Sequence, residues 1–435
     1  MAMVVKNNMS AISTLNTLNK NSSALSKSLQ KVSSGMKINS AADDASGYAI
    51  SERMRVQIRG LDQANQNTQN GTSMMKVAEG AVSSTVDILK TLKEKVINAA
   101  NDTNTDADRA TIQKELDQSI DQINDNANVT YNGKYLVDGS HNSKVQATTT
   151  SLTNESLATD TASTTAFCDM KDRNGNSLNI NSMDTVTLSF VKEGKTYSTS
   201  VSATQSLGDL ITAANNKSTG AFSTTITSGS VIGKDIAGDT VATADAGNAL
   251  TIQAGGTGVS KQISGLTISV TNTQGQVQKS ANAVLDNFSE MVRAQDKSND
   301  NAISLQVGTK ANQSIRVGLT DMRAEALGLQ SSSGQTIQIG TQQQANAAIN
   351  VLDTAVQKAL DQQTTIGAVQ SRLSYTSSNL TTASENVQSS ESTIRDADMA
   401  KEMTEYTKNN VLLQAAQSML AQANQSSSSV LSLLQ

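Results

Sequence analysis

Proline and tryptophan are absent from this 435-residue sequence, and cysteine and histidine occur once each. The lone Cys168 cannot form an intramolecular disulfide. The lone His141 cannot build a multi-histidine metal site. Scattered Ser and Asp residues cannot form a Ser-His-Asp site without a nearby histidine. No run of eighteen apolar residues occurs, so no helix is expected to span a bilayer. We therefore expect no catalytic residue, no cofactor and no metal.

The missing proline has two explanations of equal weight, since average usage would give roughly twenty prolines. A chain without proline avoids slow cis/trans isomerisation when it refolds. Long helices and a Thr-rich sheet also exclude proline by themselves. Aromatic residues make up only 2% of the chain, so its cores must rest on Leu, Ile, Val, Met and Ala.

The formal net charge is −5, which indicates neither a nucleic-acid partner nor an anionic membrane surface. Residues 1–8 lack the apolar core of a secretory signal peptide. Taken alone, this start predicts a cytoplasmic protein unless another export route applies.

Both ends of the chain carry heptad spacing. Apolar and small residues recur at alternating steps of four and three within 394–435 and again within 10–35, as in a helix that packs along another helix. The partner of each segment must be another part of the chain or another copy, and we predict that the two segments pair; the resemblance described below implies that their seam is a polymerisation surface. The seam residues are Leu15, Leu18, Leu25, Leu29, Val32, Leu412, Ala416, Met419, Ala423, Val430 and Leu433.

Helical periodicity also predicts helices over 49–101, 107–128, 281–300 and a long one from about residue 341 to 387. Gly71 is the expected break in the first of these. Turn signals predict hairpins over 129–137 and 303–317.

Thr, Ser, Gly and Ala dominate residues 140–280, with alternating runs typical of half-buried strands. Residues 186–191 and 196–201 predict a hairpin, 250–252 and 266–270 further strands, and 207–216 a short helix. This pattern favours a folded β-rich insert over a flexible linker.

Adjacent carboxylates at Asp43 and Asp44 lie in a short polar connector just before the predicted helix 49–101. Such a pair could ligate a metal, but near a helix start we expect both residues to act as caps.

Two stretches resemble the signatures of bacterial flagellin. The first is VSSGMKINSAADDASGYAI at 32–50. The second combines IRDADMA at 394–400, TKNN at 407–410, LAQANQ at 420–425 and VLSLL at 430–434. The resemblance covers about 1–140 and 285–435. The start KNN at 6–8, where the family usually has Asn-Thr-Asn, departs from it without threatening assembly.

The resemblance implies an α+β fold, in which a long antiparallel helical rod from both chain ends carries a β-rich central insert. It implies five segments, namely halves of an inner-tube coiled-coil domain at 1–45 and 394–435, halves of a helical outer-tube domain with a β-hairpin at 46–140 and 283–393, and a variable surface insert of one or two subdomains at 141–282.

The implied function is that of a structural subunit that self-assembles into the flagellar filament for motility. It implies export through the flagellar type III apparatus to the extracellular flagellum. The implied partners are other copies of the chain, an export chaperone on 394–435, and hook-associated junction and cap proteins.

A vertebrate Toll-like receptor reads one stretch of many flagellins, which here is residues 90–97. Glu94 matches the family, and Glu115 matches an acidic position on the next helix. Thr91 stands where Arg is usual, and Lys95 stands where Leu is usual. Loss of a guanidinium and gain of a charge at an apolar contact predict weakened receptor binding.

Alternative functions are a hook–filament junction protein, or a flagellin whose insert has an adhesive or glycan-bearing role. The close match of DDASG and LAQANQ favours flagellin. Some flagellins carry a zinc peptidase in the insert, but that needs His-Glu-x-x-His, and the single histidine excludes it.

Overall fold

The chain divides into two compact units, each built from segments that are distant in sequence. The computed structural model describes residues 8–218, 220–223, 226–243 and 247–432. Unit 1 comprises Met1–Thr68, Gln306–Gln313 and Tyr375–Gln435, and unit 2 comprises Gln69–Leu305 and Ser314–Ser374. Among the described residues, no helix has the length and apolar character needed to span a bilayer.

Long helices occupy both ends of the chain and strands fill its middle, which confirms the predicted α+β class. The helices are α1 (Met9–Ser34), α2 (Ala45–Ala99), α3 (Asp106–Ala127), α4 (Leu207–Ser218), α5 (Lys279–Leu285), α6 (Ala324–Leu327), α7 (Gln342–Arg395) and α8 (Met399–Ser432). The strands are β1 (Thr130–Tyr131), β2 (Lys134–Tyr135), β3 (Ser151–Asn154), β4 (Thr185–Lys192), β5 (Lys195–Ser202), β6 (Thr227–Gly229), β7 (Val231–Lys234), β8 (Thr240–Ala242), β9 (Ala249–Gln253), β10 (Ile263–Thr271), β11 (Ser289–Val292), β12 (Ile303–Gln306) and β13 (Ser314–Val317).

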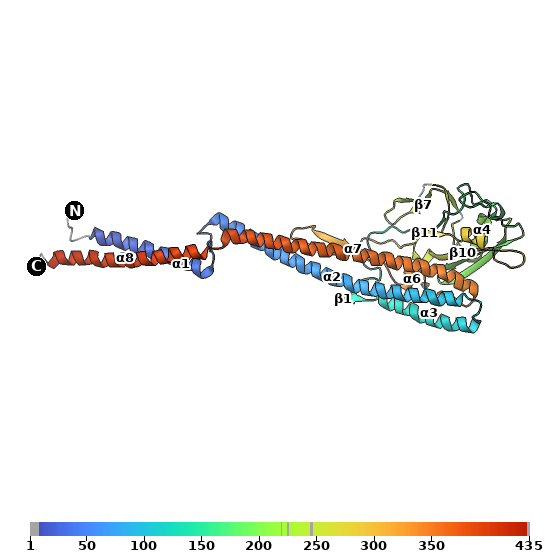
Figure 1. Cartoon of the computed structure of the whole chain (residues 1–435), viewed down its shortest axis with the longest axis horizontal. Coiled ribbons are helices and arrows are strands. Elements are labelled where there is room, and N and C mark those ends of the chain that lie inside the picture. The colour runs from blue at the N-terminus through green and yellow to red at the C-terminus, as the bar shows by residue number, and fades with distance from the viewer. Residues whose placement is uncertain (1–7, 219, 224–225, 244–246, 433–435) are drawn as a thin grey trace. The chain divides into compact units, whose positions relative to one another are not determined.

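Within unit 1, α1 and α8 lie side by side and run antiparallel (Figure 1). The side chain of Asn8 caps the start of α1 by accepting a hydrogen bond from the Ala11 N–H (2.9 Å). Gly35 ends the helix with φ of 70°, a left-handed conformation that glycine adopts without strain. The predicted helix stop at this glycine is confirmed.

Unit 1 also contains the first part of α2 and the last part of α7, which pack against each other. Leu61, Ala64 and Leu380 form a small buried cluster between these helices. Next to it, the Ser377 hydroxyl donates a hydrogen bond of 2.7 Å to the Asn65 side chain. The contact is therefore partly polar, and burial of a few aliphatic groups adds to its stability.

Unit 2 contains α3 and the remaining parts of α2 and α7, packed along one another (Figure 1). The predicted break in α2 at Gly71 is wrong, since the helix continues through it. A Cβ at that position would lie 2.7 Å from Leu305 Cδ1, so glycine makes room for the neighbouring hairpin. The buried aliphatic core of this part includes Met75, Val82, Leu89, Val96, Leu116, Ile120, Ile123, Val351, Leu352 and Ile366.

The insert in unit 2 is folded, and its predicted strands and helix over 186–270 are confirmed. Three antiparallel strands order as β10-β4-β5, and four order as β11-β3-β9-β6. Phe190 is fully buried between them and makes an edge contact with Phe222, with ring centroids 4.7 Å apart.

Side chains cover the outer edge of β10, which would otherwise present unpaired backbone groups. Asp286 and Asn282 accept hydrogen bonds from the N–H groups of Ile268 (2.9 Å) and Val270 (2.7 Å). From α7, Asn350 donates to the Leu266 carbonyl (3.0 Å). This edge is consequently closed to pairing with a further strand.

The predicted helix over 281–300 is wrong after its first turns. Helix α5 ends at Leu285, where the Asn154 amide donates to the carbonyl of Val284 (2.8 Å). The chain then enters β11, which pairs antiparallel with β3. Pairing with an existing sheet therefore overrides local helical periodicity. The two predicted hairpins over 129–137 and 303–317 are confirmed as β1-β2 and β12-β13.

Candidate assembly surface

Polar side chains fix the register between α1 and α8. The Asn21 amide donates to the Leu412 carbonyl (3.2 Å), and the Asn409 amide donates to the Ser28 hydroxyl (3.0 Å). Further along, Lys31 forms an ion pair of 3.7 Å with a carboxylate of α8. Because these polar contacts are lost when one helix slides along the other, they favour a single alignment of the two helices.

The face that joins the two helices is built from small and polar residues together with leucines. On α8, Ala416 is buried and Leu413, Leu420 and Ala423 are half-buried. On α1 the equivalent face holds Ser28, which is buried, with Leu18, Leu25 and Val32 half-buried. Alanine and serine let two helices approach closely, so this face forms a narrow joint.

The predicted seam splits into two groups in the structure. Leu18, Leu25, Val32, Ala416 and Ala423 lie on the joining face. Leu15, Leu29, Leu412 and Met419 are exposed, the last with 63% of its surface open to solvent. Leu433 and the side chain of Val430 lie outside the described part of the chain.

The predicted and observed sets differ because they follow the same spacing from different starting positions. Steps of four and three can be traced through two adjacent sets of positions, and both contain Ala416 and Ala423. The structure uses the set with Asn409, Leu413 and Leu420, which sequence reasoning missed. The same four-three spacing in that set was the signal that could have found it.

Large exposed apolar residues therefore remain on the paired helices. We refer to them as the exposed apolar set: Met9, Ile12, Leu15, Leu29, Met399, Met403, Val411, Leu412 and Met419. Such a concentration of apolar surface is typical of a protein interface.

A cluster around Arg395 joins the connector after α1 to the connector between α7 and α8. Its guanidinium donates to a carboxylate oxygen of Glu52 (2.6 Å) and lies over the Tyr48 ring at 5.4 Å. Its carbonyl accepts from the Lys37 N–H (2.7 Å). The hydrogen bond from Arg395 holds the pKa of the Glu52 carboxyl below its usual value. The connector after α1 and the connector between α7 and α8 are thus held together next to the paired helices α1 and α8.

The predicted capping role is confirmed for Asp44 and is wrong for Asp43, whose side chain holds the preceding turn of the connector. Asp43 accepts hydrogen bonds from the N–H groups of Ser40 (3.0 Å) and Asn39 (3.2 Å), and the first of these is the main cause of its lowered pKa. Asp44 accepts from the Gly47 N–H (3.0 Å) at the start of α2. The pair therefore shapes the connector.

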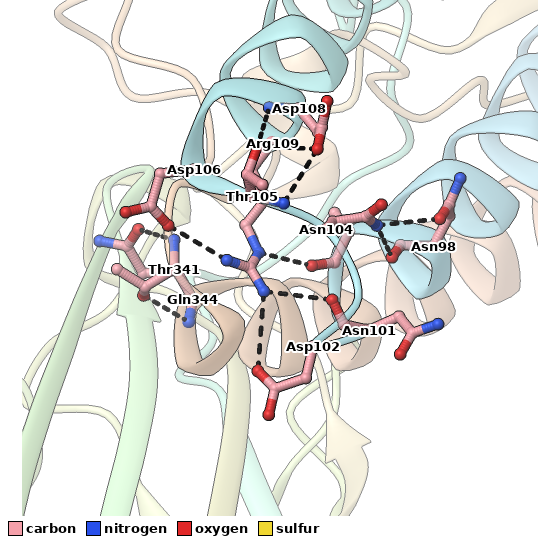
Figure 2. Close-up of polar contacts among 11 residues, drawn as sticks. Asn98, Asn101, Asp102, Asn104, Thr105, Asp106, Asp108, Arg109, Thr341 and Gln344 are labelled. Atoms are coloured by element: carbon pink, nitrogen blue, oxygen red, sulfur yellow. Dashed lines mark hydrogen bonds and ion pairs between the residues drawn. The ribbon is translucent and has the colours of Figure 1, made fainter.

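The turn between α2 and α3 is held by a buried arginine (Figure 2). The Arg109 side chain donates to the carbonyl of Ala99 (2.9 Å), the last residue of α2, and to that of Asn101 (3.1 Å) in the turn. Thr105 and Asp108 form a reciprocal capping box at the start of α3. Both helix ends at this turn are consequently fixed.

The four residues of the receptor segment lie on these two helices. Thr91 and Glu94 are exposed on α2. Lys95 forms an ion pair of 3.0 Å with Glu115 of α3. Sequence reasoning missed this pair, because Lys95 lies closer to the turn at 100–105 than Glu115 does, and position along two antiparallel helices does not by itself bring them together. The acidic group at Glu115 is thus already engaged within the chain.

The fold is that of a structural protein whose two terminal helices pair within the chain. Residues 5–142 match the family model for the bacterial flagellin N-terminal helical region, and residues 349–434 match that for the C-terminal helical region. A flagellin of Clostridium tyrobutyricum is 35% identical, with 97% of this chain and 99% of the relative covered. A flagellin of Bacillus subtilis is 30% identical, with 99% and 100% covered.

Among solved structures, FliC from Burkholderia pseudomallei is similar at 18% identity, covering 69% of this chain and 99% of that chain with a TM-score of 0.26. The family assignment rests on the sequence matches. This chain belongs to the bacterial flagellins, and it is a structural subunit of the flagellar filament.

Proposed function

We propose that the exposed apolar set is the surface through which copies of this chain polymerise. The observation that carries the proposal is the split of the heptad pattern. Small and polar residues join α1 to α8, whereas Leu15, Leu29, Leu412 and Met419 face solvent. Burial of each such side chain by a neighbour contributes roughly 1.5–3 kcal/mol.

The direct test replaces Met419 with Asp, because a carboxylate cannot be buried there without a large desolvation cost. The matched control is Gln414→Asp, which adds the same charge at another exposed position of α8. We expect the Met419→Asp protein to fold, by circular dichroism, and to form no filaments under the electron microscope. Filaments of Met419→Asp equal in yield to those of the control would overturn the proposal.

The same apolar surface would require cover before assembly. An export chaperone bound to 394–435 would shield Leu412 and Met419 until the chain leaves the cell by the flagellar type III route. Coexpression of the chain with its chaperone, followed by native mass spectrometry, should give a one-to-one complex. Removal of 394–435 should abolish that complex.

The filament ends supply further partners. Hook-associated junction and cap proteins would contact the same terminal helices at either end of the filament, outside the cell. The chain acts as material for the filament and carries out no reaction, which agrees with its single histidine.

We expect weak binding to the vertebrate receptor. The ion pair between Lys95 and Glu115 supports it, because the receptor would have to compete for a carboxylate that is already paired. Thr91 offers one hydroxyl, which donates to the Asp87 carbonyl (3.0 Å), in place of a guanidinium fork.

A further inference from the structure

A polar cavity of about 550 Å³ lies within unit 2. It is bounded by the segment that follows β11, by the loop that precedes α6 and by the middle of α7. This volume falls in the range of pockets that hold small organic molecules. The assembly surface belongs to unit 1, so the cavity has no role in that account.

Cationic side chains outnumber carboxylates around the cavity. Two arginines are each held by a carboxylate. Arg293 Nη1 lies 2.5 Å from Asp361, and Arg323 donates through Nε (3.0 Å) and Nη2 (2.6 Å) to Asp321. Their charges are therefore largely compensated within the chain, which directs attention to a third cation of the lining.

Lys358 is this third cation, and it differs from the two arginines. Its Nζ donates to the Gln262 side-chain oxygen (3.2 Å) and to the Ala326 carbonyl (3.3 Å), both of which are neutral. Among the described residues, no carboxylate lies within 4.0 Å of Nζ. Burial lowers the pKa of Lys358, and the charge of Glu290 opposes that effect. The ammonium therefore lacks a carboxylate in direct contact, although the charge of Glu290 reaches it from a greater distance.

Gln362 lies one helical turn further along α7 and also lines the cavity. The Thr320 N–H (3.3 Å) and hydroxyl (2.6 Å) both point to its Oε1. Because a backbone N–H can only donate, the amide orientation is fixed. Its Nε2 has no hydrogen-bond partner among the described residues, and only 4% of Gln362 is exposed. Two donors on one face of α7 therefore lack an acceptor of negative charge.

We propose that this cavity binds a small oxyanion, either a carboxylate or a phosphate group. Lys358 supplies the charge, and Gln362 supplies a second donor after a small adjustment of its side chain. The ligand would give Lys358 a negatively charged acceptor in direct contact, where its present hydrogen-bond acceptors are neutral. Hydroxyl and amide groups around the cavity, including Thr320, Ser298 and Asn142, would suit polar substituents of the ligand.

The test uses the full-length monomer with inorganic phosphate or acetate as probe, at constant ionic strength set by sodium chloride. We expect isothermal titration calorimetry to detect binding of one or both anions, and Tm to rise with their concentration. Binding of phosphate alone or acetate alone identifies which oxyanion the site prefers. Absence of binding by both anions would overturn the proposal.

Lys358→Gln removes the charge and keeps donor groups near Gln262 and Ala326. We expect it to weaken anion binding at least about tenfold, the loss typical of a charge-assisted hydrogen bond. The matched control is Lys90→Gln, which removes an exposed lysine of α2 in the same unit and should leave binding unchanged. Equal affinity in Lys358→Gln and the native chain would contradict the assignment.

Gln362→Glu provides an independent variant, because its carboxylate would place in the cavity the negative charge that a bound anion would otherwise supply. We expect this protein to fold and to lose its response to phosphate and acetate. A different occupant is an acidic side chain of a second copy. Carbodiimide cross-links from Lys358 to another copy in filaments, with no anion binding by the monomer, would replace the oxyanion proposal with that contact.

Discussion

The Asn409 side-chain amide donates a hydrogen bond of 3.0 Å to the Ser28 hydroxyl, joining helices from opposite ends of the chain. Residues 381 positions apart in sequence thereby meet on one narrow face. Leucines that would pack well there, Leu29 and Leu412, lie one step around their helices and are exposed. The pairing of the two ends thus leaves apolar surface for other molecules.

Asn409→Ala should weaken the pairing of α1 and α8. Loss of this hydrogen bond, with the Ser28 hydroxyl left in place, should cost about 1 kcal/mol per subunit. Filaments should then dissociate at a lower temperature, as measured by light scattering. Gln417→Ala, at an exposed position of the same helix, is the control. Identical dissociation temperatures for the two variants would show that the hydrogen bond contributes nothing.

Two glycines should respond to alanine in opposite directions. A Cβ at Gly265 of β10 would lie 2.9 Å from the Ala347 carbonyl oxygen of α7, a backbone atom that cannot move freely. Gly265→Ala should lower the free energy of unfolding by about 1–3 kcal/mol. A Cβ at Gly80 in α2 would meet no atom within 4 Å, so Gly80→Ala should raise it by about 1 kcal/mol. Urea unfolding of the monomer measures both values. A Gly265→Ala protein with the same free energy of unfolding as the native chain would contradict the close contact between β10 and α7.

Asp286 should make stability depend on pH. Burial raises the pKa of this carboxyl to about 6, and the hydrogen bond from the Ile268 N–H only partly opposes the shift. The folded state therefore holds the proton more tightly than the unfolded state, whose pKa is near 3.8. This contribution is fully present below about pH 4 and is lost as pH rises through about 6, by up to about 3 kcal/mol.

Asp286→Asn should remove that dependence while keeping an acceptor for Ile268. We expect the difference in Tm between the variant and the native monomer to change in favour of the variant as pH rises from 4 to 7. Thermal melts followed by circular dichroism at several pH values measure it. A difference that stays constant across this range would mean that Asp286 titrates normally.

Receptor binding should increase when the two unusual residues are reversed. Thr91→Arg adds a guanidinium fork, and Lys95→Leu removes a charge and releases Glu115 from its ion pair. The double variant should bind the receptor ectodomain at least about tenfold more tightly by surface plasmon resonance. Lys144→Gln, at an exposed lysine outside residues 90–97, serves as the control. Binding of the native monomer at about nanomolar concentration would contradict the weakened contact.

Much of this fold follows from the sequence, because helix periodicity and turn residues act locally. The lengths of α3 and α4 and the two short hairpins illustrate this. The helix expected over 281–300 failed, since β11 is stabilised by β3, a partner far away in sequence. Gly71 was misjudged for a similar reason, because only the packed Leu305 explains it.

The contact face between α1 and α8 was only partly predictable. The spacing gave the correct period on α1 and α8, but hydrophobicity favoured Leu412 and Met419 for the joining face. The joining face instead contains Asn409 and Ala416. In a single sequence, an apolar residue that faces its own chain cannot be told from one that awaits another copy. That distinction requires the geometry of the helix pair.

Thiol labelling of Met419→Cys, in a background with Cys168→Ala, tests the central claim most directly. Met419 is exposed in the single chain, so the introduced thiol should react rapidly in the monomer. Met183→Cys in the insert, at another exposed site, controls for entry of the reagent. We predict that filament assembly slows labelling at 419 at least about a hundredfold relative to 183, the ratio expected for burial worth roughly 3 kcal/mol. Equal labelling rates in monomer and filament at 419 would contradict the account.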